Sequence, residues 1–129
     1  MVHTGQNYKK ELKDFFFKDL EIRDPDYNLE INTSSYGSEV ADVIKKSYEL
    51  MVKVKPDALL VLGDTYSGLS VMPAAHLGIK IFHMEAGLRA WDKRMPEQRN
   101  RMLIDHMSNI LFPFNTYHRE NLLNFFPLK

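Results

Sequence analysis

The sequence predicts an α/β fold built on a parallel, doubly wound sheet. Two continuous apolar runs have the length of buried strands, DALLVL at residues 57–62 and IKIF at residues 79–82. Segments with helical spacing of apolar residues, about 10–15 residues long, lie between the predicted strands. Strands that alternate with helices of this length are typical of a parallel sheet covered by helices.

The first half of the chain is predicted to form two helices and an edge strand. ELKDFFFKDL has apolar residues at helical spacing, which predicts an amphipathic helix over residues about 7–20. YNLEIN, residues 27–32, alternates as a short edge strand does. A Ser with Glu close behind it then marks a second helix, whose apolar residues recur from Val40 to Met51 until Pro56 ends it.

The second half is predicted to alternate strand and helix three times. The strand in DALLVLGDT leads into a short helix, SGLSVMPAAHLG, which Gly78 closes. IKIFHME, residues 79–85, is the next buried strand, and a helix follows over residues about 97–109. NILFP, residues 109–113, predicts a third short strand, and NTYHRENLLNFF a last helix.

Composition bounds the class of protein. The 129 residues suffice for one domain, and Lys+Arg and Asp+Glu both number 17, so no net charge favours nucleic acid or an anionic membrane. The absence of cysteine excludes disulfides, thiolate catalysis and a cysteine zinc site. No apolar run approaches a membrane span of about 20 residues and no signal peptide is recognisable, so a cytoplasmic protein is expected.

Carboxylates follow both central strands at the edge of the sheet where ligands bind in such folds. Asp64 comes directly after the first strand, and it either caps the next helix or lies at the floor of a site. Glu85 leaves the second strand, and it either pairs with Arg89 or serves as an acid or base in a poorly solvated position. Two such acids in different environments can run both halves of a proton-transfer reaction.

A cationic segment follows Glu85. Five cations and two anions give it a local charge of +3 between Arg89 and Arg101. Arginine suits phosphate oxygens, and Pro96 opens a helix whose first N–H groups attract anions. A solvated charged face is the alternative. A metal site is not expected, because the spacing of the four candidate ligands matches no strong zinc motif: His83, Glu85, Asp105 and His106.

Four motifs in register resemble one family. VHTGQNY, KPDALLVLGDT, HMEAGLR and MPEQRNR are similar in order and spacing to motifs of the non-hydrolysing UDP-N-acetylglucosamine 2-epimerases. The resemblance implies a partial Rossmann-like N-terminal domain of a two-domain GT-B-type fold. It also implies a UDP-sugar substrate and a reaction that eliminates UDP, forms a glycal and adds UDP back with C2 inverted. No metal or nicotinamide cofactor is implied.

The resemblance assigns roles to six residues of this chain. Asp64, Glu85 and Glu97 match the family's catalytic carboxylates. Substrate binding is expected of a further three, which are Arg89, Arg101 and Gln6. The segment from Gln6 to Lys9 departs from the family's GQHRQ-like pattern, so allosteric activation by a second UDP-sugar is not expected.

The resemblance is also incomplete. Glu97-Gln98 replaces the family's paired glutamates and AWDKRM resembles the capsule-sugar branch, so UDP-N-acetylglucosamine and related UDP-sugars stay open. The family's opening strand with its GTRPE loop and its second domain have no counterpart, so YNLEI and ALLVL are expected to flank a gap. We expect a fragment or split-gene product, residues 1–129 of the N-terminal domain without the C-terminal one, which needs the missing segments from a second chain or self-association. The alternatives are an inactive remnant, an association-only subunit or a flavodoxin-like phosphate-binding module.

Overall fold

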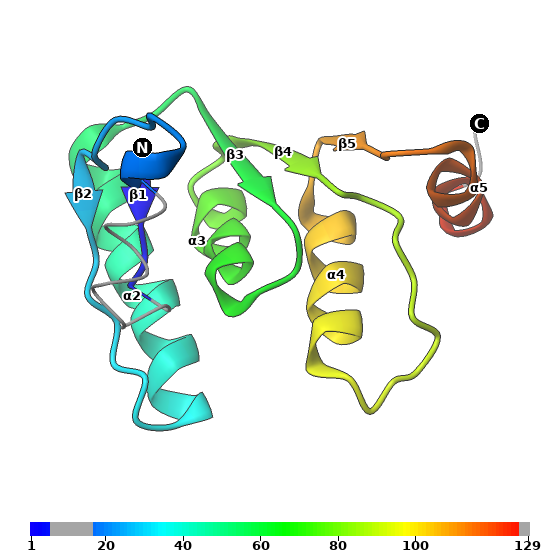
Figure 1. The fold of residues 1–129 in the computed structure, drawn as a ribbon, viewed down its shortest axis with the longest axis horizontal. Helices are drawn as coiled ribbons and strands as arrows, with labels where there is room; N and C mark the ends of the chain where they lie inside the picture. The colour runs from blue at the N-terminus through cyan, green and yellow to red at the C-terminus, as the bar shows by residue number, and fades with distance from the viewer. Residues whose placement is uncertain (6–16, 127–129) are drawn as a thin grey trace.

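The computed structural model describes residues 1–5 and 17–126 (Figure 1). Its strands form two parallel sheets rather than one. The first sheet pairs β1 (Val2–His3) with β2 (Tyr27–Asn28), and the second has the order β3 (Ala58–Leu62), β4 (Lys80–Met84) and β5 (Ile110–Phe112). The α/β class with parallel strands is therefore confirmed. So is the expected break between the YNLEI and ALLVL strands.

Helices follow the strands as the apolar spacing predicts. They are α2 (Tyr36–Val54), α3 (Val71–His76), α4 (Pro96–Met107) and α5 (Thr116–Phe125). The Ser35 side chain caps α2 by accepting from the Ser38 N–H, and Lys55 ends it in the left-handed conformation just before Pro56. The predicted helix at residues about 7–20 falls largely outside the described residues, of which 17–19 are helical.

Two segments differ from their predicted form. Within the predicted edge strand at residues 27–32, only Tyr27–Asn28 form a strand with β1, although the N–H groups of Leu29 and Ile31 still donate to the carbonyls of His3 and Thr4. The segment after Thr65 starts as a 3-10 helix, η1 (Tyr66–Ser70), and becomes α3 only at Val71. This tight turn brings the buried Gly68 within reach of Ile104 on α4.

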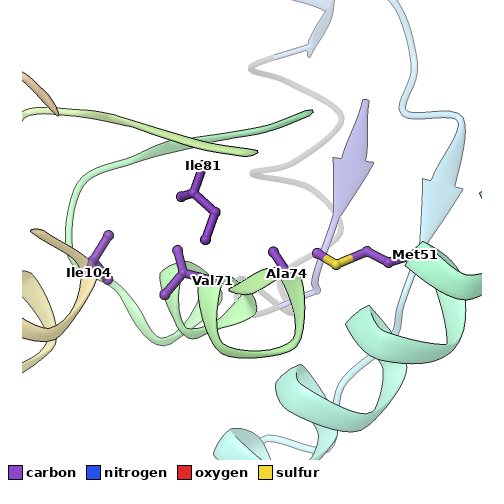
Figure 2. Close-up of a cluster of buried hydrophobic side chains, with 5 residues drawn as sticks. All are labelled: Met51, Val71, Ala74, Ile81 and Ile104. Atoms are coloured by element: carbon purple, nitrogen blue, oxygen red, sulfur yellow. The ribbon is translucent and has the colours of Figure 1, made fainter. Parts of the chain in front are cut away.

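The core lies between the β3–β5 sheet and the helices along one of its faces. Figure 2 shows side chains from α2, α3, β4 and α4 pointing toward one another, namely Met51, Val71, Ala74, Ile81 and Ile104. A second cluster joins Ile31, Val43 and Leu69 beside α2. The opposite face of the sheet exposes large apolar side chains, among them Leu60, Leu62, Ile110 and Phe112. Among the described residues, no helix is both long enough and apolar enough to span a bilayer.

Candidate active site at the carboxyl ends of β3 and β4

The turns after β3 and β4 lie side by side because their strands pair in register, with Leu62 opposite Met84. Gly63 has a φ of +76° and Glu85 a φ of +67°, so the chain turns sharply at both points. A Cβ added to Gly63 would lie 3.0 Å from Oε2 of Glu85. Glycine at this position therefore leaves room for the Glu85 carboxylate over the turn that carries Asp64.

Glu85 is held in a strained backbone conformation. A non-glycine residue in the left-handed region costs about 1–2 kcal/mol. Such positions persist where the surrounding structure fixes them, and they cluster at functional sites. The half-buried Glu85 is thus held in a backbone conformation that is unfavourable for an isolated residue.

Arg101 on α4 pairs with Asp64. Its guanidinium forms an ion pair with the carboxylate of Asp64 and reaches Oε1 of Gln98 at 3.4 Å. The neighbouring Asn100 amide donates to the Asp64 carbonyl at 3.0 Å, which fixes the turn to the helix from a second point. Burial lowers the pKa of the Arg101 guanidinium, and the charge of Asp105 partly offsets this shift. Nε of Arg101 is buried with no hydrogen-bond partner among the described residues, so one donor stays unused.

Glu97 occupies the first turn of α4, directly after Pro96 and four residues before Arg101. This spacing places both side chains on one side of the helix, and a carboxylate at a helix N-terminus is favoured by the helix dipole. Glu97 is exposed. Burial raises the pKa of the Tyr66 phenol, and the nearby Tyr36 and the charge of Glu97 raise it further. The charge of Glu97 therefore acts on Tyr66 at the start of η1, next to the turn that carries Asp64.

A buried charged cluster of His83, Arg89 and Asp105 contacts both turns. The Asp105 carboxylate on α4 contacts Nδ1 of His83 at 2.8 Å and the Arg89 guanidinium at 2.7 Å. It also accepts from the Gly87 N–H at 3.3 Å. His83 in turn reaches the Gly63 carbonyl with Nε2 at 3.0 Å. One carboxylate therefore links the turn after β3 to the turn after β4.

The loop after Glu85 is fixed to α5 as well. The Asn121 amide donates to the Gly87 carbonyl at 2.9 Å, and the Arg89 guanidinium lies 5.3 Å from the centre of the Phe125 ring. A Cβ added to Gly87 would lie 2.2 Å from the His118 carbonyl oxygen, so only glycine permits this approach. Farther along the loop, the Ala90 N–H donates to Gln98, which returns the chain to α4.

The structure brings together Asp64, Glu85 and Arg101 of the residues that the sequence singles out, with Glu97 one helical turn before Arg101. The Arg89 side chain is fully buried against Asp105, and its predicted role in substrate binding stays a prediction. Gln6 lies outside the described residues. The cationic segment is divided, because Arg89 and Arg101 are buried whereas Arg94 pairs with Asp92 at the surface.

The candidate metal ligands are not grouped as a metal would need. His83 and Asp105 contact each other in the core, whereas the exposed His106 ring contacts the carbonyl of Met102 in its own helix. Among residues 1–5 and 17–126, no three His, Cys, Asp or Glu side chains form a cluster that could hold an ion. The joint role of His83 and Asp105 in holding the turns was missed in the sequence. Its one signal was a histidine at an inward position of an apolar strand, two residues after Ile81.

Comparison with known proteins shows the family. Residues 1–125 match the family model described as UDP-N-acetylglucosamine 2-epimerase. The chain belongs to this epimerase family. A UDP-N-acetylglucosamine 2-epimerase homolog of Methanococcus maripaludis is 49% identical over 113 residues, which are 87% of this chain and 32% of that protein.

Further members of the epimerase family agree in sequence and in fold. The UDP-2,3-diacetamido-2,3-dideoxy-D-glucuronate 2-epimerase of Pseudomonas aeruginosa is 39% identical over 125 residues, 96% of this chain and 35% of that protein. The crystal structure of the Methanocaldococcus jannaschii epimerase in complex with UDP-GlcNAc and UDP superposes with a TM-score of 0.94 at 35% identity. This superposition covers 98% of the chain and 35% of that structure. The chain thus spans about a third of the length of these relatives and shares the fold of that part.

Proposed function

We propose that this chain provides one wall of the active site of a UDP-sugar 2-epimerase. The substrate is UDP-N-acetylglucosamine or a related UDP-sugar, since relatives with either kind of name are similar to it. The observation that carries the proposal is the meeting of Asp64, Glu85 and Arg101 at the carboxyl ends of two paired parallel strands. Ligands bind at this edge in open parallel sheets.

The proposed chemistry divides between carboxylates and cations. A base removes the C2 proton, the C1–O bond breaks, its electrons leave with UDP, and a C1=C2 double bond remains. Addition of UDP to C1, with a proton delivered to the opposite face of C2, gives the epimer. Asp64, Glu85 and Glu97 supply the proton-transfer groups in this proposal, because a carboxylate can act as a general acid or base and all three match the family's motifs.

Arg101 is proposed to contact the diphosphate of the substrate. Its guanidinium lies beside the Asp64 carboxylate at this edge of the sheet, and it would form a charge-assisted hydrogen bond to a phosphate oxygen of the substrate. The charge of Arg101 would then act where negative charge develops as UDP leaves. In the absence of substrate the same guanidinium stabilises the ionised carboxylate of Asp64.

We further propose that residues 1–129 act as part of the N-terminal domain of such an enzyme. The remaining segments would come from a second chain or from self-association, because the relatives are about three times as long. The cytoplasmic location expected from the sequence stays a prediction.

A hybrid enzyme tests the proposed site. Residues 1–125 of this chain would replace the matching third of the Methanococcus maripaludis relative, and epimerisation of UDP-N-acetylglucosamine would be followed by NMR. Asp64→Asn, Glu85→Gln and Glu97→Gln should each slow turnover by about 100-fold or more. Glu49→Gln, an exposed change on α2, is the matched control. Turnover close to that of the unmodified hybrid in all three variants would refute the assignment.

A further inference from the structure

His83 is a fully buried titratable side chain to which the proposed reaction assigns no role. Neither its ring nor the Asp105 side chain that it contacts is exposed to solvent. Nδ1 of the ring lies 2.8 Å from Oδ1 of Asp105, and Nε2 lies 3.0 Å from the Gly63 carbonyl oxygen. Both ring nitrogens therefore have an oxygen partner at hydrogen-bond distance.

These two partners determine how many protons the His83 ring shares. A carbonyl oxygen only accepts hydrogen bonds, so Nε2 must donate to Gly63. A neutral imidazole has a proton on one nitrogen alone, so Nδ1 would then present a lone pair to the Asp105 carboxylate. Two facing lone pairs at this distance are unfavourable where both side chains are shielded from solvent. A second proton must therefore lie between Nδ1 and Asp105.

The other contacts of Asp105 indicate which group holds this second proton. Oδ2 of Asp105 contacts the Arg89 guanidinium at 2.7 Å and accepts from the Gly87 N–H at 3.3 Å. A positive charge and a donated hydrogen bond both stabilise the ionised carboxylate over the protonated acid. These contacts favour the proton on His83, as an imidazolium that donates from both nitrogens.

The charge balance around the two turns favours the same state. Among the described residues, the charged side chains in and beside these turns are three carboxylates and two guanidiniums, all buried or half-buried: Asp64, Glu85, Asp105, Arg89 and Arg101. With a neutral His83 and an ionised Asp105 this group would have a net charge of −1. Buried charges are costly unless they are compensated, and an imidazolium at His83 makes the group neutral.

We propose that His83 is an imidazolium that positions the turn carrying Asp64, by donating from Nε2 to the Gly63 carbonyl while Asp105 holds its Nδ1. Gly63 directly precedes Asp64, so this contact fixes the peptide group from which the Asp64 side chain extends. His83 is thus a positioning residue, which acts on a proposed proton-transfer group through the backbone. Its effect on catalysis rests on the proposed function, whereas its charge and its contact with the turn do not.

NMR of the purified chain with isotope-labelled histidine tests the charge. At neutral pH the ring of His83 should carry a proton on each nitrogen, and each proton should show its one-bond coupling to nitrogen. The chain has five histidines, so the His83 signals are assigned by their loss in His83→Gln. A single protonated ring nitrogen on His83 at neutral pH would overturn the proposal.

Two amide variants separate the two contacts of the ring. The Gln amide reaches as far as Nε2 and can still donate to the Gly63 carbonyl, whereas the Asn amide reaches only as far as Nδ1 and can donate to Asp105 alone. The Gly63 N–H donates to the Met84 carbonyl. Its hydrogen exchange should be about tenfold faster or more in His83→Asn than in His83→Gln. Equal exchange in the two variants would overturn the positioning role.

The hybrid enzyme tests the same variants in turnover. The kcat should be about tenfold lower or more in His83→Asn than in His83→Gln with KM little changed, because a displaced Asp64 impairs the chemical step rather than binding. His106→Asn, which changes an exposed histidine of α4, is the matched control and should keep both constants. Equal kcat of the two His83 variants in an active hybrid would overturn the positioning role. If the unmodified hybrid is inactive, the proposed function fails, while the ring protons and the Gly63 exchange of the chain still decide on His83.

Discussion

Replacement of Asp105 by Asn measures how much of the fold depends on the buried charged cluster. The change keeps the shape of the side chain and removes the negative charge that Arg89 and His83 contact. Removing one partner of a buried ion pair costs about 3–5 kcal/mol, because the other charge stays buried and uncompensated. Domains of this size have a total unfolding free energy of about 5–15 kcal/mol, so the loss should be a large share of it.

The expected shift in melting temperature follows from the length of the chain. Each kcal/mol corresponds to about 4 °C for a domain of roughly 130 residues, so Asp105→Asn should melt about 12–20 °C lower. Urea unfolding followed by circular dichroism gives the free energy directly. Adding Arg89→Met should recover part of the loss, because it removes the unpaired buried charge.

Asp92→Asn is the matched control for this experiment. Asp92 also pairs with an arginine, Arg94, but both side chains are exposed at the surface, where such pairs contribute little. The reasoning would be refuted if Asp105→Asn unfolded at the same urea concentration as Asp92→Asn. The turns after β3 and β4 should loosen together in Asp105→Asn, since the cluster holds Gly63 and Gly87 at once.

Three further predictions concern α5, pH and ligand binding. Gly87→Ala should lower the free energy of unfolding by more than about 1–2 kcal/mol, which is the cost of a left-handed backbone alone, because the added Cβ would also meet the His118 carbonyl. The control, Gly37→Ala on α2, adds a Cβ with nothing within 4 Å and should not lower it. Burial raises the pKa of Tyr66 above its ordinary value of 10.0, so the stability that its protonated phenol contributes is present below pH 10 and is lost as the pH rises through the raised pKa. In an alkaline titration of tyrosine absorbance, Tyr66→Phe should remove a component that titrates above pH 10. In the hybrid enzyme, Arg101→Ala should reduce the UDP-induced rise in melting temperature, and an unchanged rise would contradict the proposed diphosphate contact.

Much of the fold and the outline of the site could be predicted from local pattern. The runs that form β3 and β4 are continuous and apolar, and turn residues bound them, so their type and order follow from the sequence. Parallel pairing then places the residues after each strand at one edge of the sheet. The sequence alone therefore predicts that Asp64 and Glu85 lie next to each other.

What the sequence did not predict depends on contacts between distant residues. Asp105 lies 22 residues from His83, and no spacing rule indicates that one carboxylate contacts both His83 and Arg89. Arg89 and Arg94 look alike in a basic segment, although one is buried and the other is exposed. An apolar run also looks the same whether or not helices cover both faces of its strand, so the exposure of Leu60 on the open face of the sheet was not foreseeable.

The most direct test of the proposed function is an assay of the chain alone and in combination. The purified chain would be incubated with UDP-N-acetylglucosamine, and NMR would follow the C2 epimer and free UDP. We predict no turnover by the chain alone, because the residues described here form a single wall that cannot enclose the sugar and exclude water. We predict turnover once the remaining two thirds of the Methanococcus maripaludis relative is added as a separate chain. Robust epimerisation by the monomeric chain alone would contradict the account. It would also be contradicted if the combined mixture and the hybrid enzyme both failed to epimerise the substrate.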